Sequence, residues 1–258
     1  MMITQKILEK SSGLFGPISV GKSFLPSSYW MKIKDEIEGQ VFADHEGNPG
    51  AIAASRYLYG FILPAWHFPA SHGLMLGLGA GIGATMLLTL FPDLHLTVVE
   101  IDADIIRLTR AYFPFVSFYE KQNRLRIIHA DASDYVNTTQ NKFAFALMDV
   151  FSGDENSYHN IILLENVRAI SSYYMANIIA TEVLLPDISE DAIWIRTSPD
   201  LPTQRSNWML TNMKNFSPEI AGFQLFERHH QEKNSIKIAN RYFQYILSQI
   251  KATCFYYM

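Results

Sequence analysis

A long uncharged stretch in the first half of the chain, GLMLGLGAGIGATMLLTLF, covers residues 73–91. It is nearly long enough to cross a bilayer as one helix. Against that interpretation, no Lys or Arg occurs between Arg56 and Arg107, and five glycines within eleven residues make a poor helix start. The pattern therefore favours a buried strand, a turn and a helix.

The glycines divide this stretch. We predict a strand over 74–76, a turn that contains Gly77, Gly79 and Gly81, and a helix that runs through 86–91. Glycine in such a turn allows open backbone dihedrals and lets a ligand come close to the main chain. The helix that follows offers free N–H groups. The spacing approaches the dinucleotide fingerprint G-x-G-x-x-G without matching it.

Three further apolar runs end in acidic residues. LHLTVVEID (94–102), RLRIIHADASDY (124–135) and KFAFALMDVFSG (142–153) each read as a buried strand, and the helix ADIIRLTRAYF follows the first of them. In a parallel sheet, the carboxyl ends of the strands lie at the edge where ligands bind. The acids at these strand ends are Glu100, Asp131 and Asp149.

Each of these acids has a functional and a structural interpretation. Glu100 lies a little over twenty residues beyond the first turn glycine, where an acid can accept both hydrogen bonds of a ribose diol. A helix N-cap or a loop carboxylate is the structural alternative, and it is the simpler one for Asp131 taken alone. Acids at consecutive strand ends favour a ligand site.

The remaining segments are predicted from shorter patterns. Residues 1–70 show alternation and turns typical of hairpins, so we predict a small N-terminal β-rich element before a main domain over 71–258. We expect a polar loop after Asp149 and a fifth strand at 192–198, with 178–185 as its rival. The other predicted elements are helices over 161–179, 203–216 and 241–258 and an antiparallel pair at 222–230 and 234–241.

Composition narrows the class of protein. The chain has 258 residues, 48% of them hydrophobic and 18% charged, which is typical of a globular protein with a filled core. The net charge is −4 with no cluster of Lys and Arg, so we expect no nucleic-acid partner. A single cysteine, Cys254, excludes an intramolecular disulfide and a multi-thiolate zinc site. The first residues lack the apolar core of a signal peptide. We therefore expect a cytoplasmic protein without a membrane span or a metal.

The successive motifs GLMLGLGAGIGA, LTVVEIDADIIRLTRAYF, LRIIHADASDY and FALMDVFSGD resemble those of the spermidine synthase (polyamine aminopropyltransferase) family. The resemblance covers about residues 70–160, and VVEID followed by a helix and YFP is its most specific piece. It implies the S-adenosylmethionine-dependent methyltransferase-like fold. That fold is an α/β, Rossmann-like, doubly wound, mostly parallel sheet, here with the small N-terminal β-rich element.

The resemblance also implies roles for the residues at the strand ends. In the family, the glycine turn approaches the nucleoside, and the acid after the second strand holds the ribose hydroxyls. The Asp-Ala pair after the third strand contacts the adenine edge. The Asp after the fourth strand lies beside the reacting centre and helps to deprotonate the attacking amine, which implies a catalytic role for Asp149. The implied cofactor-binding residues are Gly77, Gly79, Gly81, Glu100, Ile101, Asp131 and Ala132.

The sequence departs from the family pattern at two acids. Ala80 stands where the family's glycine turn carries an Asp that helps to hold the aminopropyl group, and Ser152 stands where its D-x-x-D-P segment has the second Asp. The family's upstream Tyr-His-Glu has no clear copy, although Tyr57 and Tyr59 fall nearby. The weaker candidates for contact with the acceptor substrate are Tyr57, Asp154, Tyr158 and His159.

We therefore predict a transferase that uses S-adenosylmethionine or its decarboxylated form to move an aminopropyl or methyl group to an amine or polyamine. The loss of the acid at Ala80 would suit a donor that keeps its own carboxylate, which is ordinary S-adenosylmethionine. The alternatives are an S-adenosylmethionine-dependent methyltransferase, an NAD-dependent oxidoreductase and a catalytically inactive homologue. In the resembled family the N-terminal element often builds the oligomer, so a homodimer is a further expectation.

Overall fold

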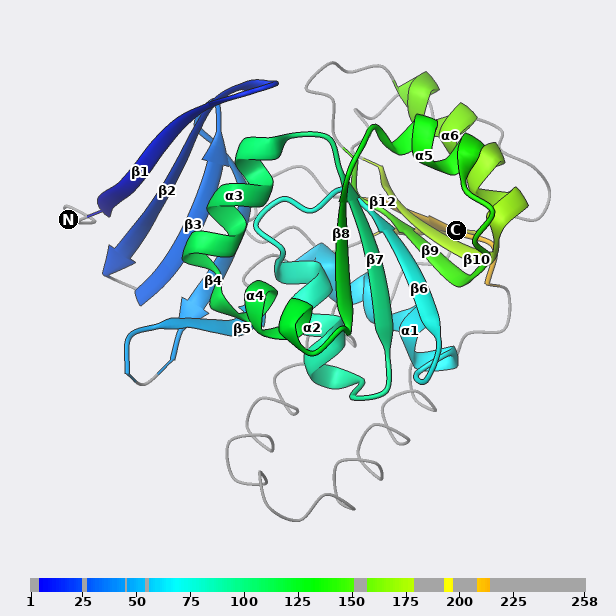
Figure 1. Cartoon of the computed structure of the whole chain (residues 1–258), viewed down its shortest axis with the longest axis horizontal. Helices are drawn as coiled ribbons and strands as arrows, with labels where there is room; N and C mark the ends of the chain where they lie inside the picture. Colours follow the sequence, from blue (N-terminus) through cyan, green and yellow to red (C-terminus); the bar gives the residue numbers. More distant parts are fainter. Residues whose placement is uncertain are drawn as a thin grey trace, which may run out of the picture.

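Two sheets organise the chain, with helices on both sides of the larger one (Figure 1). The N-terminal sheet has five strands, and the second sheet has seven. The computed structural model describes residues 5–24, 27–44, 46–53, 56–150, 157–178, 193–196 and 208–213.

The N-terminal sheet is an antiparallel meander in which each strand pairs with the next along the chain. Alternate residues on one of its faces, including Ile18, Val20 and Met31, are buried in the main core. This period-2 pattern confirms the strands and hairpins that the sequence predicts before residue 70. The strands are β1 (Gln5–Gly13), β2 (Gly16–Phe24), β3 (Ser27–Ile33), β4 (Glu36–Ala43) and β5 (Pro49–Ala53).

The second sheet has the order β11-β12-β10-β9-β6-β7-β8. Five neighbouring strands, from β10 to β8, are parallel, and β12 runs antiparallel to both of its neighbours. The doubly wound, mostly parallel sheet is thus confirmed. Its strands are β6 (His72–Leu76), β7 (His95–Glu100), β8 (Leu125–His129), β9 (Phe143–Met148), β10 (Ser171–Ile178), β11 (Ile193–Arg196) and β12 (Trp208–Thr211).

The helices cover the two faces of this sheet and enclose a core on each. Helices α1 to α4 contribute to one core together with the N-terminal sheet, whereas α5 and α6 contribute to the other. Neighbouring residues of β6 show the alternation, because Met75 faces the first core and Leu76 the second. The helices are η1 (Arg56–Phe61), α1 (Ile62–His67), α2 (Ile82–Leu90), α3 (Ala103–Tyr112), α4 (Pro114–Lys121), α5 (Ala132–Thr138) and α6 (Ser157–Ile170).

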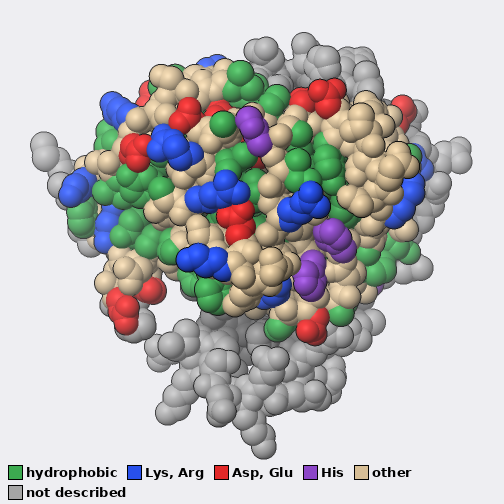
Figure 2. Space-filling model, viewed as in Figure 1, with side chains coloured by type: hydrophobic (Ala, Val, Ile, Leu, Met, Phe, Trp, Pro, Cys, Tyr) green, Lys and Arg blue, Asp and Glu red, His purple; other side chains and the backbone are tan. Residues whose placement is uncertain are grey.

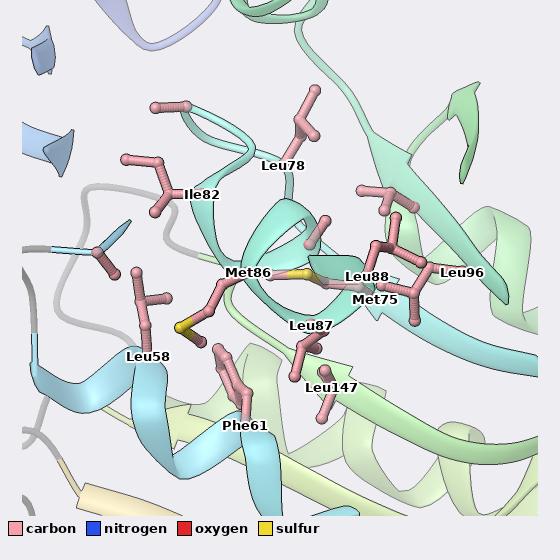
Figure 3. Close-up of a cluster of buried hydrophobic side chains, with 14 of the residues drawn as sticks. Leu58, Phe61, Met75, Leu78, Ile82, Met86, Leu87, Leu88, Leu96 and Leu147 are labelled. Carbon is pink, nitrogen blue, oxygen red and sulfur yellow. The ribbon is translucent and has the colours of Figure 1, made fainter. Parts of the chain in front are cut away.

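The hydrophobic stretch over 73–91 is a strand, a loop and a helix, as predicted. Helix α2 begins at Ile82, four residues earlier than the predicted segment, and every residue in it except Thr89 is buried. Figure 3 shows Met86 and Leu87 of α2 packed towards Phe61 and Leu147. A helix that is apolar on all sides belongs in a protein interior or a membrane. No helix in the described part of the chain is long and apolar enough to cross a membrane.

The predictions beyond residue 160 are partly wrong. The predicted helix over 161–179 ends at Ile170, and the residues that follow form β10, which pairs in parallel with β9. Strand β10 therefore occupies the place that we assigned to 192–198. That segment does form a strand, β11, but at the edge of the sheet beyond β12. Apolar spacing alone cannot separate a short buried strand from a helix that continues.

Two other elements also differ from the predictions. The predicted helix over 203–216 is wrong where it is described, because Trp208–Thr211 is strand β12. Helix α4 was not predicted as an element separate from α3, and Pro114 begins it at a position that proline favours. Helix α1 contacts β10, and η1 contacts α2, so these helices pack against the second sheet's layer. The domain boundary at residue 70 stays a prediction. The segments 179–185, 222–230, 234–241 and 241–258 lie outside the described residues.

The β1–β2 hairpin is attached to α3 by a chain of polar contacts. Ser11 donates to Asp104 (2.7 Å), and Arg107 pairs with Glu9 (2.6 Å). Asp102 caps α3 by accepting from two backbone N–H groups, and its second oxygen accepts from the backbone N–H of Leu14 at 2.6 Å. On the face shown in Figure 2, Lys and Arg side chains are interspersed with Asp and Glu side chains. Exposed ion pairs contribute little to stability, so Asp102 is the main polar connection in this interface.

Replacing Asp102 by Ala is expected to lower the free energy of unfolding by about 2–3 kcal/mol, because both the helix cap and the bond to the hairpin are lost. Asp131 offers a matched control, since it caps α5 in the same way without a bond to a distant strand. Asp131→Ala should lower the free energy of unfolding by about 1 kcal/mol. Urea denaturation measures both values, and equal losses would contradict the role of the Leu14 contact.

Candidate functional site

The strand register brings the predicted glycine turn and two of the predicted acids together. Leu76 of β6 is opposite Val99 of β7 on one side and Met148 of β9 on the other. Strand β6 is the point where the chain order of the parallel sheet reverses, and ligands bind at the carboxyl ends of strands at such a point. The residues that follow these paired positions are Gly77, Glu100 and Asp149.

Gly77 sits where only glycine fits. Its φ is +90°, and a Cβ on it would lie 2.3 Å from the carbonyl oxygen of Asp149. Its N–H donates to the carbonyl of Val99 at 2.9 Å, and the N–H of Asp149 donates to the carbonyl of Leu76 at 2.8 Å. The close approach of the two main chains therefore fixes the start of the glycine turn against the end of β9.

The carboxylate of Glu100 holds the glycine turn from the other side. One oxygen accepts from the N–H of Leu78, and the other accepts from the N–H of Asp102, both at 2.9 Å. Gly79 and Gly81 have φ values of +50° and +72°, and Gly81 is the N-cap of α2. Each carboxylate oxygen has further acceptor capacity, so Glu100 can support the turn and still accept from a ligand hydroxyl.

Asp149 is held at the end of β9 by two side chains. Tyr57 of η1 donates to one carboxylate oxygen at 3.0 Å, and Asn177 of β10 donates to the other at 2.8 Å. Burial raises the pKa of Asp149, and the hydrogen bonds from Asn177 and Tyr57 partly oppose that rise. A carboxylate with a raised pKa is a stronger proton acceptor, which suits a general base.

Sequence reasoning named Tyr57, which the structure places beside Asp149 while its contact with the acceptor stays a prediction, and it missed Asn177. Asn177 falls in the segment predicted as a helix, and its position at the carboxyl end of a strand became visible only with β10. Tyr59 belongs to the core, because its ring is buried and its hydroxyl donates to the carbonyl of Ala53 at 2.8 Å. Tyr158 and His159 are in the first turn of α6, but their side chains are outside the described part. Asp154 and Ser152 also lie outside it.

The residues predicted to contact adenine lie at the neighbouring strand end. One oxygen of Asp131 accepts from the N–H groups of Ser133 (2.8 Å) and Asp134 (3.0 Å), so capping alone accounts for this residue. Ala132 is the first residue of α5. The carbonyl oxygen of Ile101 lies 2.9 Å from Nε2 of His129. Ligand binding by Ile101, Asp131 and Ala132 stays a prediction.

Glu38 of β4 is a further acidic residue at this site, which sequence reasoning missed. Burial and the nearby charges of Asp149, Glu36 and Glu100 raise its pKa to about 7. Nothing in the local sequence KDEIEGQ marks this Glu as different from the exposed Glu36 two residues before it. Among the described residues, no group of three or more His, Cys, Asp or Glu is arranged to hold a metal ion.

The central part of the chain also matches known proteins in sequence. Residues 74–167 match the Spermine/spermidine synthase domain. This confirms the resemblance drawn from the motifs. A polyamine aminopropyltransferase of Chromobacterium violaceum is 31% identical over 102 residues, which are 40% of this chain and 37% of that protein. The one of Vibrio vulnificus is 29% identical over 119 residues, 43% of this chain and 38% of that protein. The chain thus matches little more than a third of these relatives' length.

Solved spermidine synthases share the fold over most of the chain. A probable spermidine synthase from Corynebacterium glutamicum is 18% identical with a TM-score of 0.67, over 85% of this chain and 86% of that one. A spermidine synthase in complex with the transition state analogue AdoDATO is 13% identical with a TM-score of 0.59, over 83% and 76%. These likenesses confirm the methyltransferase-like fold with its N-terminal antiparallel sheet.

Proposed function

We propose that the protein transfers the aminopropyl group of decarboxylated S-adenosylmethionine to a small amine, as the names of its relatives suggest. The observation that carries the proposal is the convergence at Gly77. Three features meet there, within the segment that matches the synthase domain: the glycine turn, the acid expected to hold the ribose (Glu100) and the candidate base Asp149. Homodimer formation, a cytoplasmic location and the absence of a nucleic-acid partner stay predictions.

The glycine turn and Glu100 fit the nucleoside part of the donor. A Cβ on Gly79 would have the carbonyl oxygen of Glu38 as its only described neighbour within 4 Å, so the turn leaves room beside its main chain. Glu100 is 6% exposed, and its carboxylate is already oriented by two backbone N–H groups. A preorganised acceptor loses little freedom when a ribose diol binds, which favours affinity.

Asp149 fits the chemical step. A neutral amine attacks the carbon next to the positively charged sulfur; the new C–N bond forms as the C–S bond breaks, and the nucleoside leaves as a neutral thioether. The nitrogen then carries an extra proton, which Asp149 accepts. Tyr57 and Asn177 hold that carboxylate in place. The rest of the rate comes from holding the two substrates in line, because the protein forms no covalent bond to either of them.

The products distinguish this reaction from its alternatives. We expect the purified chain, supplied with decarboxylated S-adenosylmethionine and putrescine or other amines, to release methylthioadenosine, detected by mass spectrometry. Release of S-adenosylhomocysteine from S-adenosylmethionine would instead assign methyl transfer. Binding of NAD in place of either donor would assign an oxidoreductase. No product with any of these amines, although the nucleoside binds, would favour the inactive homologue.

Replacing Glu100 by Gln is expected to weaken binding of methylthioadenosine by about tenfold or more, because a charge-assisted acceptor for the ribose is lost. Isothermal titration calorimetry measures the affinity. Glu120→Gln is the control, since Glu120 is an acid that pairs with Arg110 on the surface of α4. If the Glu100 variant folds and binds methylthioadenosine as well as the control does, Glu100 does not hold the ribose.

A further inference from the structure

Strand β4 carries an irregularity at one residue. In the β3–β4 pair, Met31 is opposite Gly39, but the next residue, Lys32, is opposite Ile37. Glu38 is therefore the extra residue of a β-bulge, without a partner in the ladder. Bulges are common beside active sites, where they turn a side chain towards the site.

The bulge changes which side chains face the second sheet's layer. In regular alternation, Ile37 would share the buried face with Gly39 and Val41. Instead, Ile37 is 52% exposed, and Glu38 is partly buried. The protein thus exposes an isoleucine and shelters a glutamate. This exchange is unfavourable for burial alone, so it calls for a reason at the place where Glu38 lies.

That place is the glycine turn. A Cβ on Gly39 would lie 2.6 Å from the Cβ of Ala80, so β4 rests directly against the turn, and glycine permits this approach. The carbonyl oxygen of Glu38 is 3.4 Å from the position that a Cβ on Gly79 would take. The N-terminal sheet therefore packs against the glycine turn and forms one wall of the site beside it.

Among the described residues, the charges that shift the pKa of Glu38 are all negative. They belong to Asp149 at the end of β9, Glu100 at the end of β7 and Glu36 on β4 itself. The carboxyl group of Glu38 has no hydrogen bond from any residue in the described part of the chain. Burial and these charges raise its pKa to about 7, because nothing positive among them compensates the charge of the ionised carboxylate. A cation placed among these acids would lower the pKa of Glu38 again.

We propose that Glu38 is a proton-coupled specificity residue, which ionises when a ligand brings an ammonium group to the site and then holds that group against the glycine turn. The inference rests on the proposed function, which supplies such a ligand in the decarboxylated donor. The neighbouring acids Glu100 and Asp149 would repel the additional carboxylate of ordinary S-adenosylmethionine. Ala80 contributes no acid, and Glu38, from the strand packed against it, supplies one on the same side of the site.

The test compares two ligands that share the nucleoside. Methylthioadenosine lacks the ammonium group, and decarboxylated S-adenosylmethionine carries it. The variants are Glu38→Gln, which keeps the shape and removes the charge, and Glu38→Asp, which keeps the charge. Glu36→Gln is the matched control, because it removes an exposed acid from the same strand. Calorimetry on the full chain gives the affinities, and circular dichroism establishes that each variant folds.

We expect Glu38→Gln to bind the decarboxylated donor about tenfold or more weakly than the wild type, because an ionic hydrogen bond is lost. Its affinity for methylthioadenosine should change less than twofold. Glu38→Asp should retain more donor affinity than Glu38→Gln, and Glu36→Gln should behave as the wild type. Unchanged donor affinity in Glu38→Gln would overturn the role of Glu38 and leave the proposed function intact. If methylthioadenosine binds to none of the proteins, the nucleoside site and this inference both fail.

Proton release provides a readout that a structural role would not change. Below pH 7, binding of the ammonium group requires Glu38 to lose its proton. The affinity for the decarboxylated donor should therefore rise between pH 6 and pH 8, as Glu38 becomes ionised before the donor binds. Calorimetry in two buffers of different ionisation enthalpy counts the protons released. Asp149 faces the same ligand, so the release that survives in Glu38→Gln belongs to it. Equal release by the wild type and Glu38→Gln would contradict the proton-coupled role.

Discussion

Asp149→Asn is expected to lower kcat for aminopropyl transfer by about 10²–10⁴-fold, because an amide cannot accept the proton of the attacking amine. The amide has nearly the shape of the carboxylate and keeps an oxygen for the bond from Asn177, and the Tyr57 hydroxyl can turn to accept from the new NH₂ group. Affinity for methylthioadenosine should therefore stay within about twofold of the wild type. Steady-state rates and calorimetry measure the two effects separately.

Tyr57→Phe is the companion variant, since it removes one hydrogen bond from Asp149 but leaves the carboxylate. The Tyr57 hydroxyl donates to the ionised form and lowers the pKa of Asp149. Without it, that pKa rises, and the acidic limb of the pH–rate profile should move to higher pH. A Tyr57→Phe profile that does not move, or an Asp149→Asn variant with nearly full activity, would remove Asp149 from the role of base.

The parts of the site that the sequence predicts are those fixed by local pattern. Strands β6, β7 and β9 are buried on both faces over most of their length, and a strand of this kind is a continuous apolar run in the sequence. The turn is predicted from its glycines, which permit backbone dihedrals that other residues avoid, and Gly77 and Gly81 do have positive φ. Because parallel strands end at one edge, the order of these elements was enough to expect Glu100 and Asp149 close to the turn.

The parts that the sequence does not predict depend on contacts between distant segments. Strand β10 continues directly from α6, and only its pairing with β9 makes it a strand, so Asn177 could not be placed beside Asp149. The position of Glu38 depends on a one-residue shift in the pairing of β4 with β3. Such a shift changes which residues of the strand face the core, so the alternation of polar and apolar residues does not predict it. Asp131, by contrast, shows that an acid in a motif can also cap the helix that follows it, here with one carboxylate oxygen, and its contact with adenine stays a prediction.

Gly77→Ala is expected to lower the free energy of unfolding by about 2–5 kcal/mol, the sum of a left-handed backbone strain and the overpacking of a methyl group against main chain. The φ of +90° strains any side chain, and the new Cβ would meet the carbonyl oxygen of Asp149 at 2.3 Å. That oxygen belongs to main chain at the end of a central strand, so it can move only by displacing the candidate base. Activity should therefore fall even in the molecules that remain folded.

Gly47→Ala separates these two causes. Gly47 has a similar φ of +83°, but the nearest atom to its added Cβ is the end of the Lys22 side chain at 3.6 Å. This variant should lose only the strain, about 1–2 kcal/mol, and should keep its affinity for methylthioadenosine. Urea denaturation of both variants gives the difference that belongs to the Gly77–Asp149 contact. If Gly77→Ala is no less stable than Gly47→Ala and retains its activity, the turn and the end of β9 are not packed as closely as the site requires.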